Sequence, residues 1–170
     1  MKVDFTALLC TAVLAVAGLS GCASFDGRGL VSGTSTAAEA EALMGPPAQR
    51  LPLAEGGTAL YFSRMPEGRH VFQVKVDGRG IVRSIEQMLT RKHIYEIVNG
   101  ASNRDDVLKL FGPPGRRGYL ALSEREWWEY KYQDYQDLRI LYVQFSGDGV
   151  VREVIDLRDL SREPGSRRKG

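Results

Sequence analysis

Cysteine and histidine are scarce in this sequence, and their scarcity excludes several kinds of chemistry. Among 170 residues there are two cysteines and two histidines. Cys10 and Cys22 both lie near the N-terminus, so the rest of the chain has neither a disulfide nor a thiol nucleophile. His70 and His93 occur without a second ligand motif such as His-x-x-x-His, Cys-x-x-Cys or a carboxylate-rich calcium loop. We therefore expect no metal site.

The sequence also lacks the short motifs that usually mark an active site or a nucleotide site. It contains no Gly-x-Ser-x-Gly segment and no glycine loop of the phosphate-binding type. Its formal net charge is +2, with 23 basic and 21 acidic side chains. A balance so near zero does not favour nucleic acid as a partner. We expect a protein without enzymatic activity and without a cofactor.

The N-terminal segment has the pattern of a secretory signal. Lys2 precedes an apolar run from Phe5 to Ala17, which is too short for a typical membrane-spanning helix. The run is followed by Leu-Ser-Gly-Cys, which resembles a bacterial lipobox and ends at Cys22. This resemblance implies that residues 1–21 are a removable signal peptide and that Cys22 carries palmitate-type acyl chains, which hold the protein on a membrane. The alternative is a buried N-terminal helix with an incidental cysteine.

The residue after Cys22 bears on the destination of such a lipoprotein. In lipoproteins of Gram-negative bacteria, which this segment resembles, an aspartate at that position tends to retain the protein at the inner membrane. Ala23 stands there in this chain. The resemblance therefore implies a lipid anchor in the outer membrane, with the folded part on the periplasmic face. Residues 22–32 are polar and glycine-rich, which is typical of a tether.

Two similar segments organise the rest of the chain. Residues 33–47 read GTSTAAEAEALMGPP and residues 100–114 read GASNRDDVLKLFGPP, and the two align position by position without a gap. Each copy has capping residues, a short helical pattern and a Gly-Pro-Pro stop. A recurrence at a fixed offset of this kind indicates an internal repeat.

Three stretches with strand character follow each helical segment. They cover residues 59–64, 70–76 and 81–87 in the first half, and residues 126–132, 138–145 and 150–157 in the second. Glycine-containing turns join the last two stretches of each half, which is typical of antiparallel hairpins. We interpret residues 48–58 and 115–123 as loops.

These patterns predict an α+β fold made of two tandem units, residues 33–90 and residues 91–157. Each unit is expected to contain a helix pair and a three-stranded antiparallel sheet, with the helices packed on one sheet face. In the second unit, residues 91–99 supply the additional helix. Residues 158–170 are polar and basic and predict a disordered tail.

The repeated motifs resemble the BamE family of small outer-membrane lipoproteins, also called SmpA or OmlA. In the second half the resemblance rests on Gly100, Val107, Gly112, Pro114, Trp128 and Tyr130. The first half departs from the pattern, with Ala40 in place of the valine and Tyr61-Phe62-Ser63 in place of Trp-x-Tyr. Two such units in tandem are similar to the β-lactamase inhibitor protein, whose duplicated unit forms a concave sheet that grips a protein.

The resemblance implies a non-enzymatic outer-membrane lipoprotein that binds a protein partner. For the BamE family that partner is the barrel-assembly machinery, and the implied role is outer-membrane protein assembly or envelope integrity. The similarity to the β-lactamase inhibitor protein implies the alternative, a periplasmic inhibitor or sensor module that captures a soluble protein on its concave sheet.

Strand alternation predicts which side chains form the partner-binding surface. The row Trp128, Tyr130 and Tyr132 should face the helices together with Leu141, Val143 and Phe145. The opposite row then holds Trp127, Glu129 and Lys131 on one strand and Ile140, Tyr142 and Gln144 on the next. We predict that Trp127 and Tyr142 anchor the partner beside Ile140, with Gln144 and Gln73 as polar neighbours. The alternative is that the predicted loop before Glu124 or the tail folds over these aromatic side chains.

Overall fold

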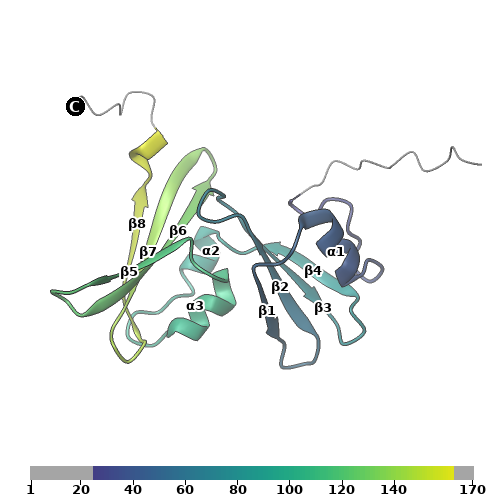
Figure 1. Ribbon diagram of the computed structural model, residues 1–170, viewed down its shortest axis with the longest axis horizontal. Coiled ribbons are helices and arrows are strands. Elements are labelled where there is room, and N and C mark those ends of the chain that lie inside the picture. Colours follow the sequence, from purple (N-terminus) through teal and green to yellow (C-terminus); the bar gives the residue numbers. More distant parts are fainter. Residues whose placement is uncertain (1–24, 163–170) are drawn as a thin grey trace, which may run out of the picture.

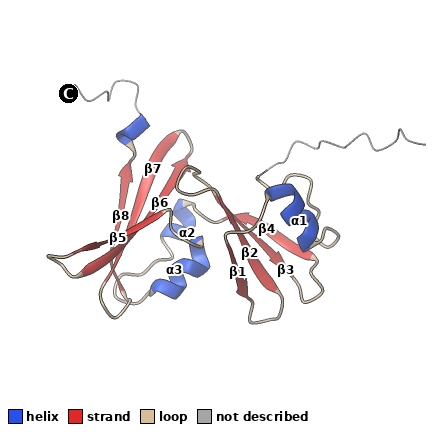
Figure 2. Cartoon of the chain, in the orientation of Figure 1, coloured by secondary structure: helices blue, strands red, loops and turns tan. Residues whose placement is uncertain are grey.

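The computed structural model describes residues 25–162, so the signal segment, Cys22 and the last eight residues lie outside the described residues. The architecture is α+β, as the sequence predicts (Figure 2). The elements are α1 (Ala37–Met44), β1 (Gln49–Pro52), β2 (Thr58–Ser63), β3 (Val71–Val76), β4 (Val82–Gln87), α2 (Arg91–Ile94), α3 (Arg104–Phe111), β5 (Arg116–Leu120), β6 (Arg125–Asp134), β7 (Asp137–Phe145), β8 (Val151–Arg158) and the 3-10 turn η1 (Leu160–Arg162). None of the helices within residues 25–162 has the length and hydropathy needed to span a bilayer.

Both longer helices begin and end in the same way. At the start of α1, Thr36 accepts a hydrogen bond from the amide of Glu39, whose carboxylate accepts one from the amide of Thr36. Asn103 forms the same reciprocal box with the third residue of α3. Each helix stops at a glycine with positive φ, 89° at Gly45 and 68° at Gly112. A proline follows each glycine and prevents continuation of the helix.

The two sheets each contain four antiparallel strands, in the orders β1-β2-β3-β4 and β5-β6-β7-β8. The prediction of three-stranded sheets is therefore wrong, because β1 and β5 lie in the stretches 48–58 and 115–123 that we interpreted as loops. Both are short edge strands with weak sequence signals, because β5 is almost entirely exposed and β1 packs only Leu51 against the core.

The prediction of a helix pair in each half is also wrong. The first half has α1 alone, and α2 in the second half is a single turn of four residues. Before α1, the chain forms turns at residues 26–34. These turns are not a free tether, because the Phe25 ring packs edge-on against Phe72 with centroids 5.8 Å apart. At the other end, Arg158 completes β8 and Asp159 is buried, so the expected disordered tail does not begin at residue 158.

The elements stack in four layers, α1, the first sheet, the pair α2 and α3, and the second sheet (Figure 1). One face of the first sheet packs on α1 through Ala40, Met44, Leu60, Phe62, Val74, Val76 and Val82. A second core joins the opposite face of that sheet to α3 and to the second sheet, and it includes Ala59, Tyr61, Val71, Val107, Phe111, Trp128, Tyr130, Leu141 and Val143. The two sheets do not form one continuous concave surface, because α2 and α3 lie between them.

Polar contacts fasten the two halves to each other. The Tyr61 hydroxyl on β2 donates to the carbonyl oxygen of Lys109 in the last turn of α3. The loop between β2 and β3, residues 64–70, reaches the second sheet, where Arg69 Nη2 lies 2.6 Å from Asp159 Oδ2. The side chains of this ion pair are 7% and 1% exposed. The halves therefore form one folded body with a shared core.

The repeat extends to the strand register, with small changes in offset. Gln49 pairs with Tyr61 in the first sheet, and Arg116 pairs with Glu129 in the second. Arg116 lies 67 positions after Gln49, the same offset as between the two helices. Glu129, which takes the place of Tyr61 in this pairing, lies 68 positions after it. Trp128 consequently occupies the place of Leu60 and not, as the sequence comparison suggested, that of Tyr61. Between these paired positions the β5–β6 hairpin has one residue more than the β1–β2 hairpin, which produces this shift.

Candidate functional site

Four of the five predicted partner-binding residues lie together on one sheet face. β6 turns Trp128, Tyr130 and Tyr132 into the core, as predicted, and each of them is buried. The opposite side, which we name the outer face, holds Trp127, Glu129 and Lys131 of β6, Ile140, Tyr142 and Gln144 of β7, Glu153, Ile155 and Leu157 of β8, and Arg116 and Gly118 of β5. It is the side of the second sheet that faces away from α2 and α3.

Trp127 belongs to β6, and its side chain lies across the neighbouring strand β5 on the outer face. Its partner in the ladder is Gly118. A Cβ at that glycine would stand 2.5 Å from Trp127 Cζ2, so only glycine leaves room for the indole. The ring of Tyr142 meets the indole edge-on, with centroids 5.8 Å apart and planes at 77°. Trp127 and Tyr142 are half-buried, and their packing holds each ring in a fixed orientation.

Glu129 is a buried hydrogen-bond acceptor that lies between these two rings and the edge strand β5. The Tyr142 hydroxyl donates to Glu129 Oε2 at 2.8 Å. Burial, followed by this carboxylate partner, raises the pKa of Tyr142 to about 12. Glu129 is 6% exposed, and its Oε1 has no hydrogen-bond partner. The nearest recorded cation is Arg116, whose Nε lies 4.0 Å from that oxygen, beyond hydrogen-bond distance. Glu129 is therefore buried although it belongs to the outer face.

An arginine fixes the polar edge of the same surface. Arg125 Nη1 donates to Gln144 Oε1 at 3.2 Å and to Glu153 Oε2 at 3.0 Å. Gln144 is therefore buried and held in place beside Trp127. The outer face thus combines half-buried rings, an aliphatic row along β7 and β8, and one buried carboxylate oxygen of Glu129 that has no hydrogen bond.

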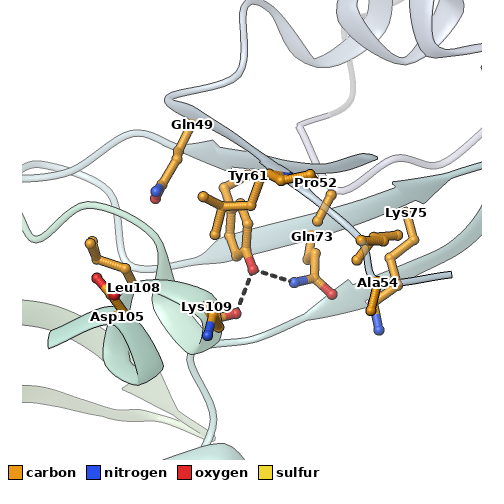
Figure 3. A pocket seen from close by; sticks show the side chains of 12 residues that line it. Gln49, Pro52, Ala54, Tyr61, Gln73, Lys75, Asp105, Leu108 and Lys109 are labelled. Atoms are coloured by element: carbon orange, nitrogen blue, oxygen red, sulfur yellow. Dashed lines mark hydrogen bonds between the residues drawn. The ribbon is translucent and has the colours of Figure 1, made fainter. Parts of the chain in front are cut away.

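Gln73 does not belong to the outer face, and this part of the prediction is wrong. It lies on β3 of the first sheet, where its Nε2 donates to the Tyr61 hydroxyl at 2.6 Å (Figure 3). Gln73 and Tyr61 point toward Lys109 of α3. The reason is the stacking of the halves, which buries this face of the first sheet against α3 and leaves the matching face of the second sheet on the outside.

The residues around Gln73 form a cleft between the first sheet and α3 with a volume of about 680 Å³. Its lining comprises Gln49, Leu51, Pro52, Leu53, Ala54, Ala59, Tyr61, Gln73, Lys75, Asp105, Leu108 and Lys109. Burial raises the pKa of Tyr61, so its hydroxyl stays protonated and can donate to the helix. Half of the lining residues are aliphatic, and the Tyr61 hydroxyl is hydrogen-bonded to Gln73 and to the carbonyl oxygen of Lys109.

Comparisons with known proteins leave the family of this chain open. No protein-family model and no curated protein matches it. Among solved structures it is similar to a DUF4309 family protein (YjgB) from Bacillus subtilis subsp. subtilis str. 168, with 14% sequence identity and a TM-score of 0.30 over 78% of this chain and 84% of that one. A likeness this distant carries no argument about function. The BamE resemblance therefore stays a prediction.

Both histidines have packing roles. His93 is buried, with Nδ1 3.0 Å from the Thr90 hydroxyl and Nε2 3.2 Å from a Glu86 oxygen. His70 stacks on Phe72, and burial lowers its pKa. Within residues 25–162 there is no group of three or more His, Cys, Asp or Glu side chains placed to hold a metal ion.

Proposed function

We propose that this protein is a non-enzymatic lipoprotein of the outer membrane that binds a protein partner through the outer face of its second sheet. Cys22 carries the lipid, and the folded part stands on the periplasmic side. The partner belongs to the machinery of outer-membrane protein assembly or envelope integrity, in keeping with the BamE resemblance. The lipobox motif supports the anchor, and the geometry of the outer face supports the partner site.

One observation carries the partner site. Trp127 and Tyr142 are packed against each other on the outer face beside a buried carboxylate, Glu129, that retains an open oxygen. Preordered aromatic rings lose little conformational entropy on binding, and tryptophan and tyrosine are enriched among residues that dominate binding energy. A surface with these properties is suited to a protein partner.

The test uses the full-length acylated protein in its own envelope. A photo-crosslinking amino acid, p-benzoylphenylalanine, is placed at Lys131 on the outer face or, as a control, at Tyr135 in the β6–β7 turn. Tyr135 is 94% exposed, so it is accessible but does not belong to the face. After irradiation and detergent extraction, we expect a discrete protein adduct from position 131 and none at the same mass from position 135.

Substitution then measures how much the predicted anchor, Trp127, contributes to the free energy of partner binding. Trp127→Ala should weaken partner binding by about 2 kcal/mol, or roughly 30-fold in Kd. Because the indole packs on Gly118 and Tyr142, the same change should also cost about 1 kcal/mol of stability. Tyr135→Ala should alter neither quantity.

The identity of the adduct decides between the possible roles. Recovery of barrel-assembly subunits in equal amounts supports a role in assembly. A soluble periplasmic protein as sole adduct supports the inhibitor or sensor role instead. If position 131 yields no protein adduct and Trp127→Ala loses stability only, the outer face is packing surface and the proposed function is wrong.

A further inference from the structure

The repeat makes the outer face equivalent to a face that already holds a helix. Across the first sheet, one row is Gln49, Tyr61, Gln73 and Glu86; across the second, the matching row is Arg116, Glu129, Tyr142 and Ile155. The β-bulges agree with this alignment, since the unpaired residue is Arg83 of β4 in the first sheet and Arg152 of β8 in the second, three residues before Glu86 and Ile155 respectively. Ala59 of the first sheet corresponds to Trp127 by the same register.

In the first sheet, α3 occupies this face. Tyr61 belongs to the same buried cluster as Val107 and Phe111, and Leu108 packs against that cluster. The Tyr61 side chain lies so close to Gly112 that a Cβ there would stand 3.3 Å from its ring, and the Tyr61 hydroxyl holds the end of α3. A helix seated across the central row is therefore the arrangement that this face accommodates.

We propose that the outer face of the second sheet is a docking site for an amphipathic helix of a protein partner, seated as α3 is seated on the first sheet, with a lysine or arginine directed at Glu129. The inference rests on the proposed function and names the element and the charge that the partner contributes. Apolar side chains of the helix contact Trp127, Ile140 and Ile155, which line the face from one edge to the other.

We infer a basic residue on the partner helix because the hydrogen-bonding roles of the central row are reversed between the two sheets. In the first sheet, the central row offers the helix a donor, the hydroxyl of Tyr61, and the carbonyl of Lys109 accepts. In the second sheet, Glu129 stands at the place of Tyr61 and can only accept. Its Oε1 is buried without a hydrogen bond, which is unfavourable until a donor arrives. Arg116, whose side chain is 61% exposed, can move aside and admit a partner's cation.

A second copy of this chain fits the site poorly. Head-to-tail stacking would place α1 of the second copy on the outer face. At the position of Leu108, α1 carries Glu41, which is paired with Arg50 at 2.6 Å. A carboxylate would then approach the open oxygen of Glu129, and like charges repel across a buried contact. The chemistry of the face favours a different protein.

Two peptides that differ in charge test the proposal on the purified protein. Both are copies of α3, residues 102–115, stapled between positions 106 and 110 because an isolated helix of this length is marginal in water. The basic peptide carries Asp105→Lys and the acidic peptide carries Lys109→Glu, since Asp105 and Lys109 lie on the side that faces the first sheet. Binding is followed by peptide fluorescence anisotropy and by backbone amide shifts of the isotope-labelled protein.

We expect the basic peptide to bind at least about tenfold more tightly than the acidic one and to shift the amides of Trp127, Tyr142 and Ile155. Glu129→Gln should reduce this preference to less than about threefold. Trp127→Ala should abolish binding of both peptides, and the matched control Tyr135→Ala should bind like the unaltered protein.

Three results would overturn the proposal. The first is equal binding of the two peptides, and the second is a set of shifts confined to the cleft around Tyr61 and Gln73. The third is concentration-dependent dimerisation in sedimentation that Trp127→Ala removes, which would make a second copy the occupant. A protein adduct at position 131 without any peptide binding would leave the proposed function standing and reject the helix. Peptide binding without an adduct in the envelope would leave the helix-docking site standing and reject the proposed function.

Discussion

The buried ion pair between Arg69 and Asp159 gives a quantitative test of how the two halves hold together. The residues lie on different halves, 2.6 Å apart, and Arg69 Nε has no hydrogen-bond partner. Asp159→Asn removes the countercharge and leaves the guanidinium buried. Breaking a buried pair in this way typically costs about 3–5 kcal/mol. We expect a loss near the lower end of that range, because the Arg139 carbonyl remains as an acceptor for Arg69, at 3.5 Å.

The pKa of Asp159 gives a second estimate. Burial opposes its ionisation, but hydrogen bonds from Ser161 and Arg69, with the charge of Arg69, outweigh burial and lower the pKa from 3.8 to about 2. That shift corresponds to roughly 2 kcal/mol. Because the pKa is lowered on folding, the stabilisation is fully present above about pH 4 and is lost as the pH falls toward 2. The stability difference between the unaltered protein and Asp159→Asn should shrink across that window.

Urea unfolding followed by circular dichroism measures both effects. At pH 7 we expect Asp159→Asn to lose about 3 kcal/mol. Arg69→Met combined with Asp159→Asn should lose clearly less than the sum of the single changes. Asp137→Asn is the matched control, since Asp137 pairs with Arg158 at the surface, and it should cost under about 0.5 kcal/mol. Additive losses below about 1 kcal/mol, or a difference as large at pH 2.5 as at pH 7, would refute the account of this contact.

Three further predictions concern single sites. Cys22→Ser should leave an unprocessed precursor that incorporates no labelled palmitate. Gly118→Ala should displace the indole of Trp127, since the new Cβ would stand 2.5 Å from its ring, and should lower the free energy of unfolding by about 1–3 kcal/mol in urea. Tyr61→Phe removes the hydroxyl that joins the first sheet to α3 and should cost about 1–2 kcal/mol in the same assay, because Gln73 loses its partner as well.

Gly118→Ala and Tyr61→Phe each have a control substitution that should leave stability unchanged. Labelled palmitate in the Cys22→Ser variant would place the acyl chains elsewhere. Gly147 has open space around it and ordinary φ, so Gly147→Ala should leave stability unchanged; an equal loss at both glycines would show that the indole is not the cause. Tyr135→Phe controls for the loss of a hydroxyl, and matched losses at Tyr61 and Tyr135 would contradict the proposed junction.

The sequence predicted the elements whose signals are local. Capping residues and a Gly-Pro stop located both longer helices, and alternation sorted the two faces of β6 and β7 correctly. The edge strands β1 and β5 escaped notice because both are short, β5 is almost entirely exposed and β1 packs only Leu51 against the core. Trp128 was matched to Tyr61 because both are aromatic, whereas the strand register places it opposite the equivalent of Arg50, where the first sheet has Leu60.

The candidate site was predictable only where it depends on a single strand pair. Trp127 and Tyr142 were placed together because alternation fixes their side of the sheet. Gln73 was misplaced because its environment depends on how one half stacks on the other, which no local pattern records. The roles of Asp159 and Gly118 could not be predicted for a similar reason. The partner of Asp159 is Arg69, which lies 90 residues earlier, and Gly118 must be glycine because of its partner across the ladder.

The order of the layers gives the molecule a polarity. Phe25 packs at the α1 end of the stack, and under the proposed acylation the lipid is attached three residues earlier, within about 10 Å of chain. The bilayer then lies beside the closed end, where α1 caps the first sheet. The outer face is the open end, on the far side of the fourth layer, and under the same proposal it would face the periplasm. A partner bound there would be held at a stand-off from the lipid, so the protein would act as a spacer that sets the height at which its partner works above the membrane.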